Sequence, residues 1–288
     1  GENRVTGVRY LHRSTGAEGE VRGRAVVVAC ACVQSIALLL LSKSSRYPAG
    51  LGNSSGQLGR NFIPHFTAGI ECFLKDLVGR PTTDDEGFLD HAYLPSFMHA
   101  RQRDYARSFG CQFNYQNHRA VGWARSLAGF GKTYKESVKA RYPAYLTFAP
   151  YGEMLPNKDS YVDLDPEKKD EHGLPLARRH VSFQENEKKL FAAMNRWGVD
   201  ILEAAGAESH SVGPEPQTNH ELGGCRMGSD PQTSVLNQWC QSHDVPNLFV
   251  VDGSAFPSSS EKNPTLTIMA LAARTADHLA GRLKKGEV

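Results

Sequence analysis

Three pieces in the last third of the chain restrict what it can fold into. Between Asn219 and Met269 the sequence places a histidine before a glycine pair (Asn-His-Glu-Leu-Gly-Gly-Cys), then an apolar run ending in an acid (Leu-Phe-Val-Val-Asp-Gly), then Asn-Pro-Thr-Leu-Thr. The glycines allow close approach of backbone to another group, and the apolar run is typical of a buried strand. Asn followed by Pro favours a helix start, whose free amides can stabilise negative charge. The segment therefore combines a candidate base, a buried strand and a helix start that can stabilise negative charge.

The first part of the chain predicts a hairpin followed by a strand, a short turn and a helix. Val5–Tyr10 and Ala17–Val21 flank the turn-rich Arg13–Gly16 and predict two paired strands. Arg24–Ala29 is a continuous β-branched run, typical of a strand buried on both faces of a parallel sheet. The Leu- and Ala-rich Gln34–Ser42 predicts the helix.

From Thr67 to about Gly206 the pattern changes to short strand-like runs separated by charged loops. The predicted strands are Ala68–Leu74, Cys111–Tyr115, Tyr145–Leu155, Tyr161–Leu164 and Ala177–Phe183. They predict an antiparallel sheet. Ser182–Glu185 then fits a capping box at the start of a helix whose apolar residues fall on one face: Leu190, Met194, Trp197 and Ile201.

Composition narrows the classes of partner. Thirty-three Lys and Arg against 31 Asp and Glu give a net charge of +2, which is no general reason to expect nucleic acid or an anionic membrane. The longest apolar run, Ala25–Leu41, is interrupted by polar residues, so we expect no membrane span and no signal-like segment. The six cysteines match no zinc pattern, and we expect no metal. Both a cytoplasmic and a periplasmic location remain open.

The three pieces of the segment from Asn219 to Met269 resemble, in the same order, the closing segment of the glucose-methanol-choline (GMC) flavin oxidoreductases. Within that family they resemble the branch of gluconate 2-dehydrogenase flavoproteins, pyranose oxidases and glucoside 3-dehydrogenases. The resemblance implies an α/β (α+β) fold with FAD as cofactor and a sugar, glycoside or polyol as substrate. It implies part of an FAD-binding domain over residues 1–66, an antiparallel-sheet substrate domain over 67–206 and the rest of the FAD-binding domain over 207–288.

Oxidation of an alcohol needs a base within hydrogen-bond reach of the hydroxyl, and a histidine suits this role near neutral pH. By resemblance, His220 is the catalytic histidine and Asn263 is the residue paired with it. An amide can hold a hydroxyl but cannot be a base at neutral pH, so the proton falls to His220. The resemblance also implies that the cofactor contacts are made by Gly223, Gly224, Asp252, Gly253, Pro264 and Thr265.

Three further residues are weaker candidates. Gln112 and Asn114 share one face of a predicted strand, where amides suit sugar hydroxyls, although a solvent-facing sheet surface explains them equally well. His65 resembles a residue near the flavin, and we expect it to fix a loop instead. His220-Glu221 opens like a zinc-protease motif, but Gly224 stands where the second ligand would be.

One family feature is missing. The family begins with a strand and a G-x-G-x-x-G turn that binds the ADP part of FAD, and these 288 residues contain no such turn. We therefore expect a C-terminal portion, completed by a second chain or by an N-terminal portion that carries the turn. The electron acceptor that reoxidises the flavin can be oxygen, a quinone, or a cytochrome or other electron-acceptor subunit. The alternative is a non-catalytic partner or scaffold subunit that kept the fold.

Overall fold

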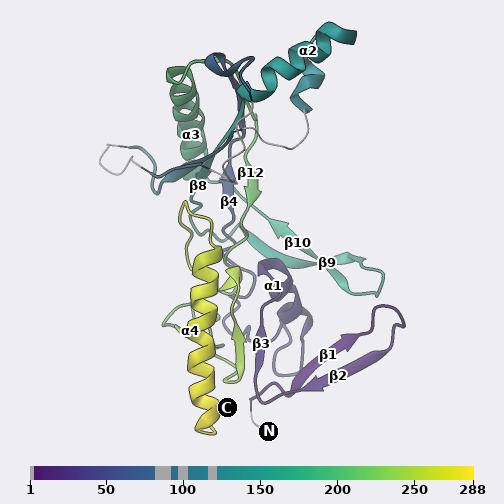
Figure 1. Ribbon diagram of the computed structural model, residues 1–288. Coiled ribbons are helices and arrows are strands. Elements are labelled where there is room, and N and C mark those ends of the chain that lie inside the picture. The colour runs from purple at the N-terminus through teal and green to yellow at the C-terminus, as the bar shows by residue number, and fades with distance from the viewer. Residues whose placement is uncertain (1–2, 82–91, 97–102, 116–121) are drawn as a thin grey trace.

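The computed structural model describes residues 3–81, 92–96, 103–115 and 122–288 (Figure 1). Two separate clusters of buried apolar side chains hold these residues together. The first cluster combines residues near both ends of the chain, and the second is formed mainly by the middle. The domain limits at 66/67 and 206/207 stay a prediction, and at both limits the neighbouring residues on either side, Phe66 with Ile70 and Leu202 with Val212, belong to or pack against the second cluster.

The first core packs a helix against two short parallel strands. Its elements are β1 (Gly7–Leu11), β2 (Glu18–Arg22), β3 (Val26–Val28), α1 (Cys32–Leu41), β13 (Leu248–Val250), η4 (Gly253–Ala255) and α4 (Thr265–Lys284). Strands β3 and β13 run parallel with Val27 opposite Phe249, and β1 pairs antiparallel with β2. The predicted hairpin and the predicted parallel strand with its following helix are therefore confirmed, the strand within shorter limits. The expectation that both faces of this strand are buried is wrong for the described chain, because Val27 is exposed while Val28 is buried.

The second core is an antiparallel sheet with a helix packed on it. The strands are β4 (His65–Thr67), β5 (Ile70–Leu74), β6 (Ala92–Leu94), β7 (Phe109–Tyr115), β8 (Tyr145–Gly152), β11 (Ala207–Val212) and β12 (Gln217–Asn219). Strand β8 is central, with β7 along one edge and β4 and β5 along the other. Helix α3 (Glu185–Ala204) buries Leu190 and Met194 against this sheet. The predicted antiparallel sheet is confirmed for the strands expected at Ala68–Leu74, Cys111–Tyr115 and Tyr145–Leu155. The strands expected at Tyr161–Leu164 and Ala177–Phe183 do not join it, because they pair with each other in a separate two-stranded sheet.

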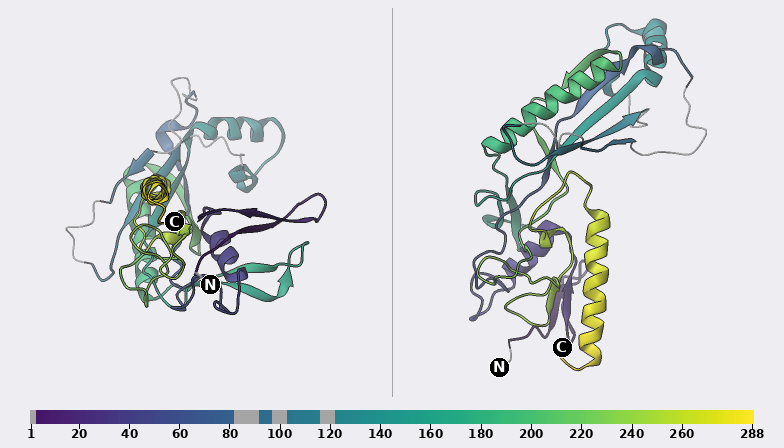
Figure 2. Two further views of the ribbon diagram at one scale, coloured as in Figure 1. Left: turned by 90° about the horizontal axis from the view of Figure 1, so that it is seen from below. Right: turned by 90° about the vertical axis from the view of Figure 1, so that its left-hand side faces the viewer.

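The remaining elements connect the two cores or extend from the sheet. They are η1 (Lys75–Leu77), η2 (Gly122–Ser126), α2 (Gly131–Arg141), η3 (Tyr142–Ala144), β9 (Tyr161–Lys169) and β10 (Pro175–His180). Strands β9 and β10 form a hairpin beside α1, and Val162 of β9 belongs to the first core. Helix α4 runs along the outside of the first core, away from the sheet (Figure 2).

The capping box predicted at Ser182–Glu185 is wrong by two residues. Helix α3 begins at Glu185, and the reciprocal pair is Gln184 with Glu187, where the Gln184 amide donates to the Glu187 carboxylate at 3.0 Å. The backbone of Ser182 is instead held by Ser160, whose hydroxyl accepts from the Ser182 amide at 2.9 Å. That bond keeps Ser182 in the preceding strand connection, so the helix starts later.

Among the described residues, no helix combines the length and apolar character needed to cross a membrane. In the same residues, no group of three or more His, Cys, Asp or Glu side chains is placed to hold a metal ion.

Candidate active site

Two chain segments far apart in sequence run side by side at the junction of the two cores. The amide of Gly59 donates to the carbonyl of Gly224 at 2.7 Å, and the amide of Ile63 donates to the carbonyl of Leu222 at 2.8 Å. One step further along, β4 pairs with β12, which places His65 opposite Asn219. We call residues 59–66 and 219–225 together the histidine segment. Its backbone hydrogen bonds bring His65 next to His220.

The imidazole rings of His65 and His220 are in direct contact. Their Nδ1 atoms lie 3.0 Å apart, and the rings meet edge to face with centroids 5.1 Å apart. Tyr151 of β8 lies against both rings, with its centroid 5.6 Å from that of His220 and 6.5 Å from that of His65. Sheet and histidine segment together therefore form a cluster of three rings around the predicted base.

His220 has the properties that a base needs at neutral pH. Its side chain is half-buried, and burial lowers its pKa from the usual 6.5, so the ring is neutral at pH 7 and able to accept a proton. Its backbone has a φ of 48°, in the left-handed region that few residues other than glycine adopt. That conformation lies between the hydrogen bonds of Asn219 and Leu222, so the surrounding chain fixes where the ring points.

His65 differs from its neighbour in burial. Its side chain has no exposed surface, and burial followed by the charge of His220 lowers its pKa to about 4. His65 is therefore neutral at pH 7. It is a residue that the sequence analysis expected only to fix a loop, and the structure places it in contact with the predicted base.

The glycine pair has a packing role inside this chain. Gly223 and Gly224 are buried and have φ values of 79° and 96°. A side-chain carbon at Gly223 would overlap the carbonyl oxygen of Asn61, and one at Gly224 would overlap the Ile36 side chain. Glycine is therefore required at both positions to keep the histidine segment closed, whereas contact with a cofactor stays a prediction.

Asp252 lies at the end of β13, where it links three parts of the first core. It is buried, and its carboxylate accepts from the hydroxyl of Ser35 on α1 and from the amide and hydroxyl of Ser254 at 2.9 and 2.6 Å. The next residue, Gly253, accepts from the amide of Gly223 at 3.0 Å. The predicted cofactor residues Asp252 and Gly253 are therefore tied to the histidine segment.

The start of α4 differs from the prediction that Asn263 caps it with Pro264 at the first helical position. The helix begins at Thr265, Pro264 is the capping position, and no side chain caps the helix. The exposed Asn263 instead accepts a hydrogen bond from Nε2 of the buried Gln112 at 2.6 Å. Because its amide oxygen is used in that bond, it does not cap, and the link joins β7 to the loop before α4.

The other predicted substrate residue is described only in its backbone. Asn114 lies on β7 opposite Thr147, and its side chain is outside the described part of the chain. Of the two amides, the structure therefore places Gln112 beside a predicted catalytic residue.

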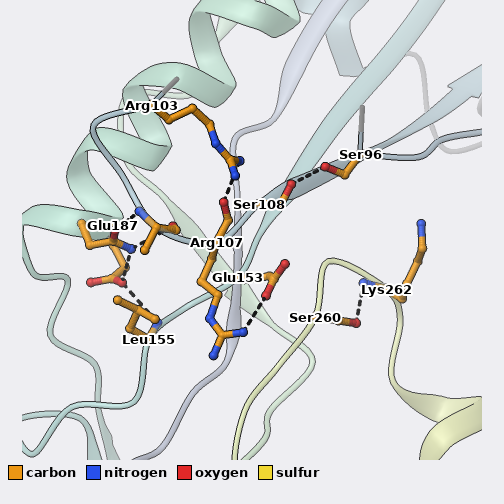
Figure 3. Close-up of polar contacts among 11 residues, drawn as sticks. Ser96, Arg103, Arg107, Ser108, Glu153, Leu155, Glu187, Ser260 and Lys262 are labelled. Carbon is orange, nitrogen blue, oxygen red and sulfur yellow. Dashed lines mark hydrogen bonds and ion pairs between the residues drawn. The ribbon is translucent and has the colours of Figure 1, made fainter. Parts of the chain in front are cut away.

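The loop before α4 meets the sheet through charged groups that the sequence analysis did not single out. Lys262 forms an ion pair with Glu261 at 3.2 Å, and its ammonium lies over the ring of Tyr93. Beside them, Arg107 approaches Glu153 at 3.8 Å (Figure 3). Burial and then the charge of Glu261 raise the pKa of Glu153 to about 6. A motif search misses these residues because they meet only through the sheet.

The residues present fit a bound organic cofactor. In the described part of the chain, four buried polar side-chain atoms have no hydrogen-bond partner. Three of them, His65 Nε2, Asn219 Oδ1 and Ser259 Oγ, belong to the histidine segment or to the loop before α4, and the fourth is Asn195 Oδ1 on α3. The first turn of α4 is exposed at Thr265 and Leu266 and contains no acidic residue. A helix start with free amides and no acid favours a group that carries negative charge.

Residues 156–272 match the family model described as GMC oxidoreductase. A 2-methyl-1,2-propanediol dehydrogenase from Mycolicibacterium austroafricanum is 34% identical over 97% of this chain and 52% of its own length. The large subunit of fructose dehydrogenase from Gluconobacter japonicus is 29% identical over 99% of this chain and 52% of its own. A formate oxidase from Aspergillus oryzae superposes with a TM-score of 0.70 at 16% identity, over 98% of this chain and 58% of its own.

Residues 156–272 therefore carry the C-terminal domain of the GMC oxidoreductases, and the chain as a whole is similar to members of that family. It spans about half the length of the curated relatives it matches. The family resemblance that the sequence carried, and the mixed fold with an antiparallel sheet, are confirmed.

Proposed function

We propose that this chain is the C-terminal catalytic portion of an FAD-dependent oxidoreductase that oxidises a hydroxyl of a sugar, glycoside or polyol. The observation that carries the proposal is the contact of a neutral, half-buried His220 with the buried His65 beside the sheet. The relatives support the substrate class, because one is named for a diol and another for fructose. The assignment to the whole protein is a proposal, since the chain corresponds to half of such enzymes.

In this proposal, His220 takes the proton of the substrate hydroxyl. FAD, when bound, supplies the acceptor for the hydride that leaves the carbon bearing that hydroxyl. A neutral imidazole accepts a proton near pH 7, and its half-buried position lets a substrate reach it. The ring of Tyr151 packs against His220 and limits where the substrate carbon can lie.

Asn263 would orient the substrate. Its amide oxygen is occupied by Gln112, which fixes the plane of the amide and leaves the Nδ2 donors to face a hydroxyl oxygen. The buried Gln112 thus acts on the substrate through Asn263. This division of roles explains why one amide of the pair is buried and the other exposed.

The cofactor would be held by the residues around the same junction. Gly223, Gly224, Asp252, Gly253, Pro264 and Thr265 would hold it, and the free amides at the start of α4 would stabilise the negative charge of a reduced flavin. The nucleotide end would be held by a G-x-G-x-x-G turn in an N-terminal portion or in a second chain. A further electron-acceptor subunit or cytochrome is compatible with the relative named as a large subunit.

Native mass spectrometry tests how the cofactor site is completed. We expect the flavin-bound mass to belong to a species that contains the glycine-rich turn, on the same chain or on a second one. Yellow protein consisting of these 288 residues alone, with flavin bound, would contradict that part of the proposal.

Anaerobic flavin reduction tests the activity. The flavin-loaded protein is mixed with sugars, glycosides and polyols in turn, and absorbance of oxidised flavin is followed. We expect at least one hydroxyl substrate to reduce the flavin, and subsequent addition of oxygen or an artificial acceptor to identify the reoxidation route. Flavin that dithionite reduces and no hydroxyl substrate does would favour the non-catalytic scaffold instead.

A further inference from the structure

We propose that His65 is a positioning residue that accepts the Nδ1 proton of His220 and thereby leaves the lone pair of His220 on Nε2, where the substrate hydroxyl can reach it. This inference rests on the proposed function, because it assigns the orientation of the proposed base. It adds to that function a second histidine, which acts on the substrate through His220.

The contact between the two rings restricts the protons they can carry. Two Nδ1 atoms 3.0 Å apart share one proton, since each neutral imidazole has one N–H and one lone pair. If His65 donates, the proton of His220 lies on Nε2, and no lone pair remains for the substrate. If His220 donates, Nε2 of His220 is free to act as the base. Only the second arrangement supports catalysis by His220.

The surroundings of His65 favour the second arrangement, in which His65 carries its own proton on Nε2. That atom is buried without a hydrogen-bond partner of good geometry in the described residues. Nevertheless, the Ser260 backbone and the Glu261 carboxylate both act on His65 in the direction that favours a proton on its ring. The Nδ1 atom of His65 is then the acceptor that His220 needs.

The backbone prevents His65 from leaving this position. Strand β4 is flanked by β8 on one side and β12 on the other, with Phe66 opposite Gly152 and His65 opposite Asn219. The side chain of His65 is fully buried, and Tyr151 lies across it. Because the His65 ring is enclosed on these sides, water cannot replace His220 as its hydrogen-bond partner. The Nδ1 atom of His65 therefore stays in place as the acceptor for His220.

A neutral acceptor also keeps the added proton on the correct ring. Burial and the neighbouring imidazole hold the pKa of His65 at about 4, so His65 stays neutral near neutral pH and does not bind the proton that His220 takes from the substrate. The charged and titratable groups around the pair are Tyr151, Glu261 and Glu221, and the last is paired with Arg179. His220 can therefore take a proton from the substrate and return it to solvent without His65 competing.

The test uses the full-length, flavin-loaded protein and two substitutions. His65→Asn keeps an acceptor oxygen near the position of Nδ1, whereas His65→Leu removes the acceptor. His278→Leu is the matched control, because His278 stacks on Trp239 at the far side of the first core. Ring nitrogen shifts of His220 are measured by NMR without substrate, and the rate of flavin reduction by substrate is measured against pH.

We expect the parent protein and the control to show His220 with its proton on Nδ1. His65→Asn should keep this tautomer and stay within about 10-fold of the parent rate, while His65→Leu should lose the fixed tautomer and react roughly 100-fold more slowly, within the usual contribution of a well-placed base. Rescue by Asn but not Leu is the signature of an acceptor. A structural role alone would lower the melting temperature and leave the tautomer of the surviving fold unchanged.

Two results would overturn the proposal. One is a parent protein in which the proton of His220 lies on Nε2. The other is a folded His65→Leu protein that keeps both the Nδ1 tautomer and the parent rate; if that variant does not fold, a His65→Asn protein without the Nδ1 tautomer decides against the proposal equally. The tautomer is observed without substrate, so failure of the proposed function, in which no hydroxyl reduces the flavin, is a separate result.

Discussion

The histidine segment and helix α4 carry the two halves of the proposed site, and the chain supports them very differently. The histidine segment is closed by backbone hydrogen bonds between residues 59–66 and 219–225, and most of its apolar side chains are buried. On α4, in contrast, Thr275 is the only residue that the described parts of the chain bury. Leu266 and Met269, in its first two turns, are exposed.

This difference shows which part of the site the chain builds unaided. The position of His220 is fixed by contacts made entirely within these residues. The start of α4 is held by the loop before it, and its outward face has no cover from the described chain (Figure 2). We therefore expect the rest of the protein to contact α4, and expect substitutions in the two regions to have different effects on stability.

The largest effect is expected from Gly223→Ala in the histidine segment. The added carbon would overlap the carbonyl of Asn61 in a left-handed backbone, so we expect a loss of about 4 kcal/mol in unfolding free energy from strain and overlap together. Gly286→Ala is the control, with φ 73° and nothing near the added carbon, and should cost about 1 kcal/mol. Urea denaturation measures both. Equal losses would show that the segment is not closed as described.

The second effect is a pH dependence that comes from His65. Its pKa falls from 6.5 in the unfolded chain to about 4 in the folded one, so between these values the unfolded state binds a proton that the folded state does not. The contribution of His65 to the unfolding free energy is therefore fully present above pH 6.5, and it should fall by on the order of 3 kcal/mol as the pH drops to 4.

Urea denaturation from pH 7 to pH 4 measures this loss. His65→Asn should flatten the curve in this interval, because it removes the titrating group, and substitution of the exposed His12 by Asn should not. Parent and His65→Asn curves of equal slope in this interval would contradict the burial of a neutral His65, because Glu153, whose raised pKa of about 6 acts in the opposite direction, contributes to both curves alike.

The third effect concerns Asp252, whose carboxylate joins α1 to η4 within the first core. Asp252→Ala leaves the Ser35 hydroxyl and the Ser254 amide buried without their acceptor, which should cost about 2 kcal/mol. Asp230→Ala is the matched control, because Asp230 is exposed and bonds only within its own turn, and should cost under about 1 kcal/mol. Thermal unfolding of the two variants separates a buried network from a local turn.

The smallest effect is expected on α4. Leu266 is 79% exposed, so Leu266→Ala should change the unfolding free energy of these residues by less than about 0.5 kcal/mol. The same change at the buried Leu190 of α3 should cost about 3 kcal/mol. In the complete protein, a larger loss at Leu266 would show that another part of the molecule covers α4. No added loss there would mean that α4 faces solvent.

The sequence predicted the elements that depend on local patterns. The β-branched run before α1, the apolar run of β13 and the antiparallel middle each appear where their periodicity placed them. Helix ends were less predictable, since the side-chain oxygens of Ser182 and Asn263, which could cap a helix, accept from the side chains of Gln184 and Gln112 instead. A short polar side chain can satisfy several partners, and local sequence does not say which one tertiary packing brings closest.

The candidate site shows the same limit at longer range. His220 was identified from its neighbours in sequence and from a family resemblance. The role of His65 was not, because 155 residues separate it from His220 and the contact depends on the pairing of β4 with β12. Nothing in the local sequence of His65 distinguishes a loop-fixing histidine from one that orients a base.

The central claim is that His220 is the base, and anaerobic stopped-flow reduction of the bound flavin in His220→Ala tests it most directly. The account predicts flavin that is still bound and still reduced by dithionite, with reduction by substrate slowed by about 100-fold or more, while His278→Ala matches the parent protein. Substrate reduction of His220→Ala at the parent rate would contradict it.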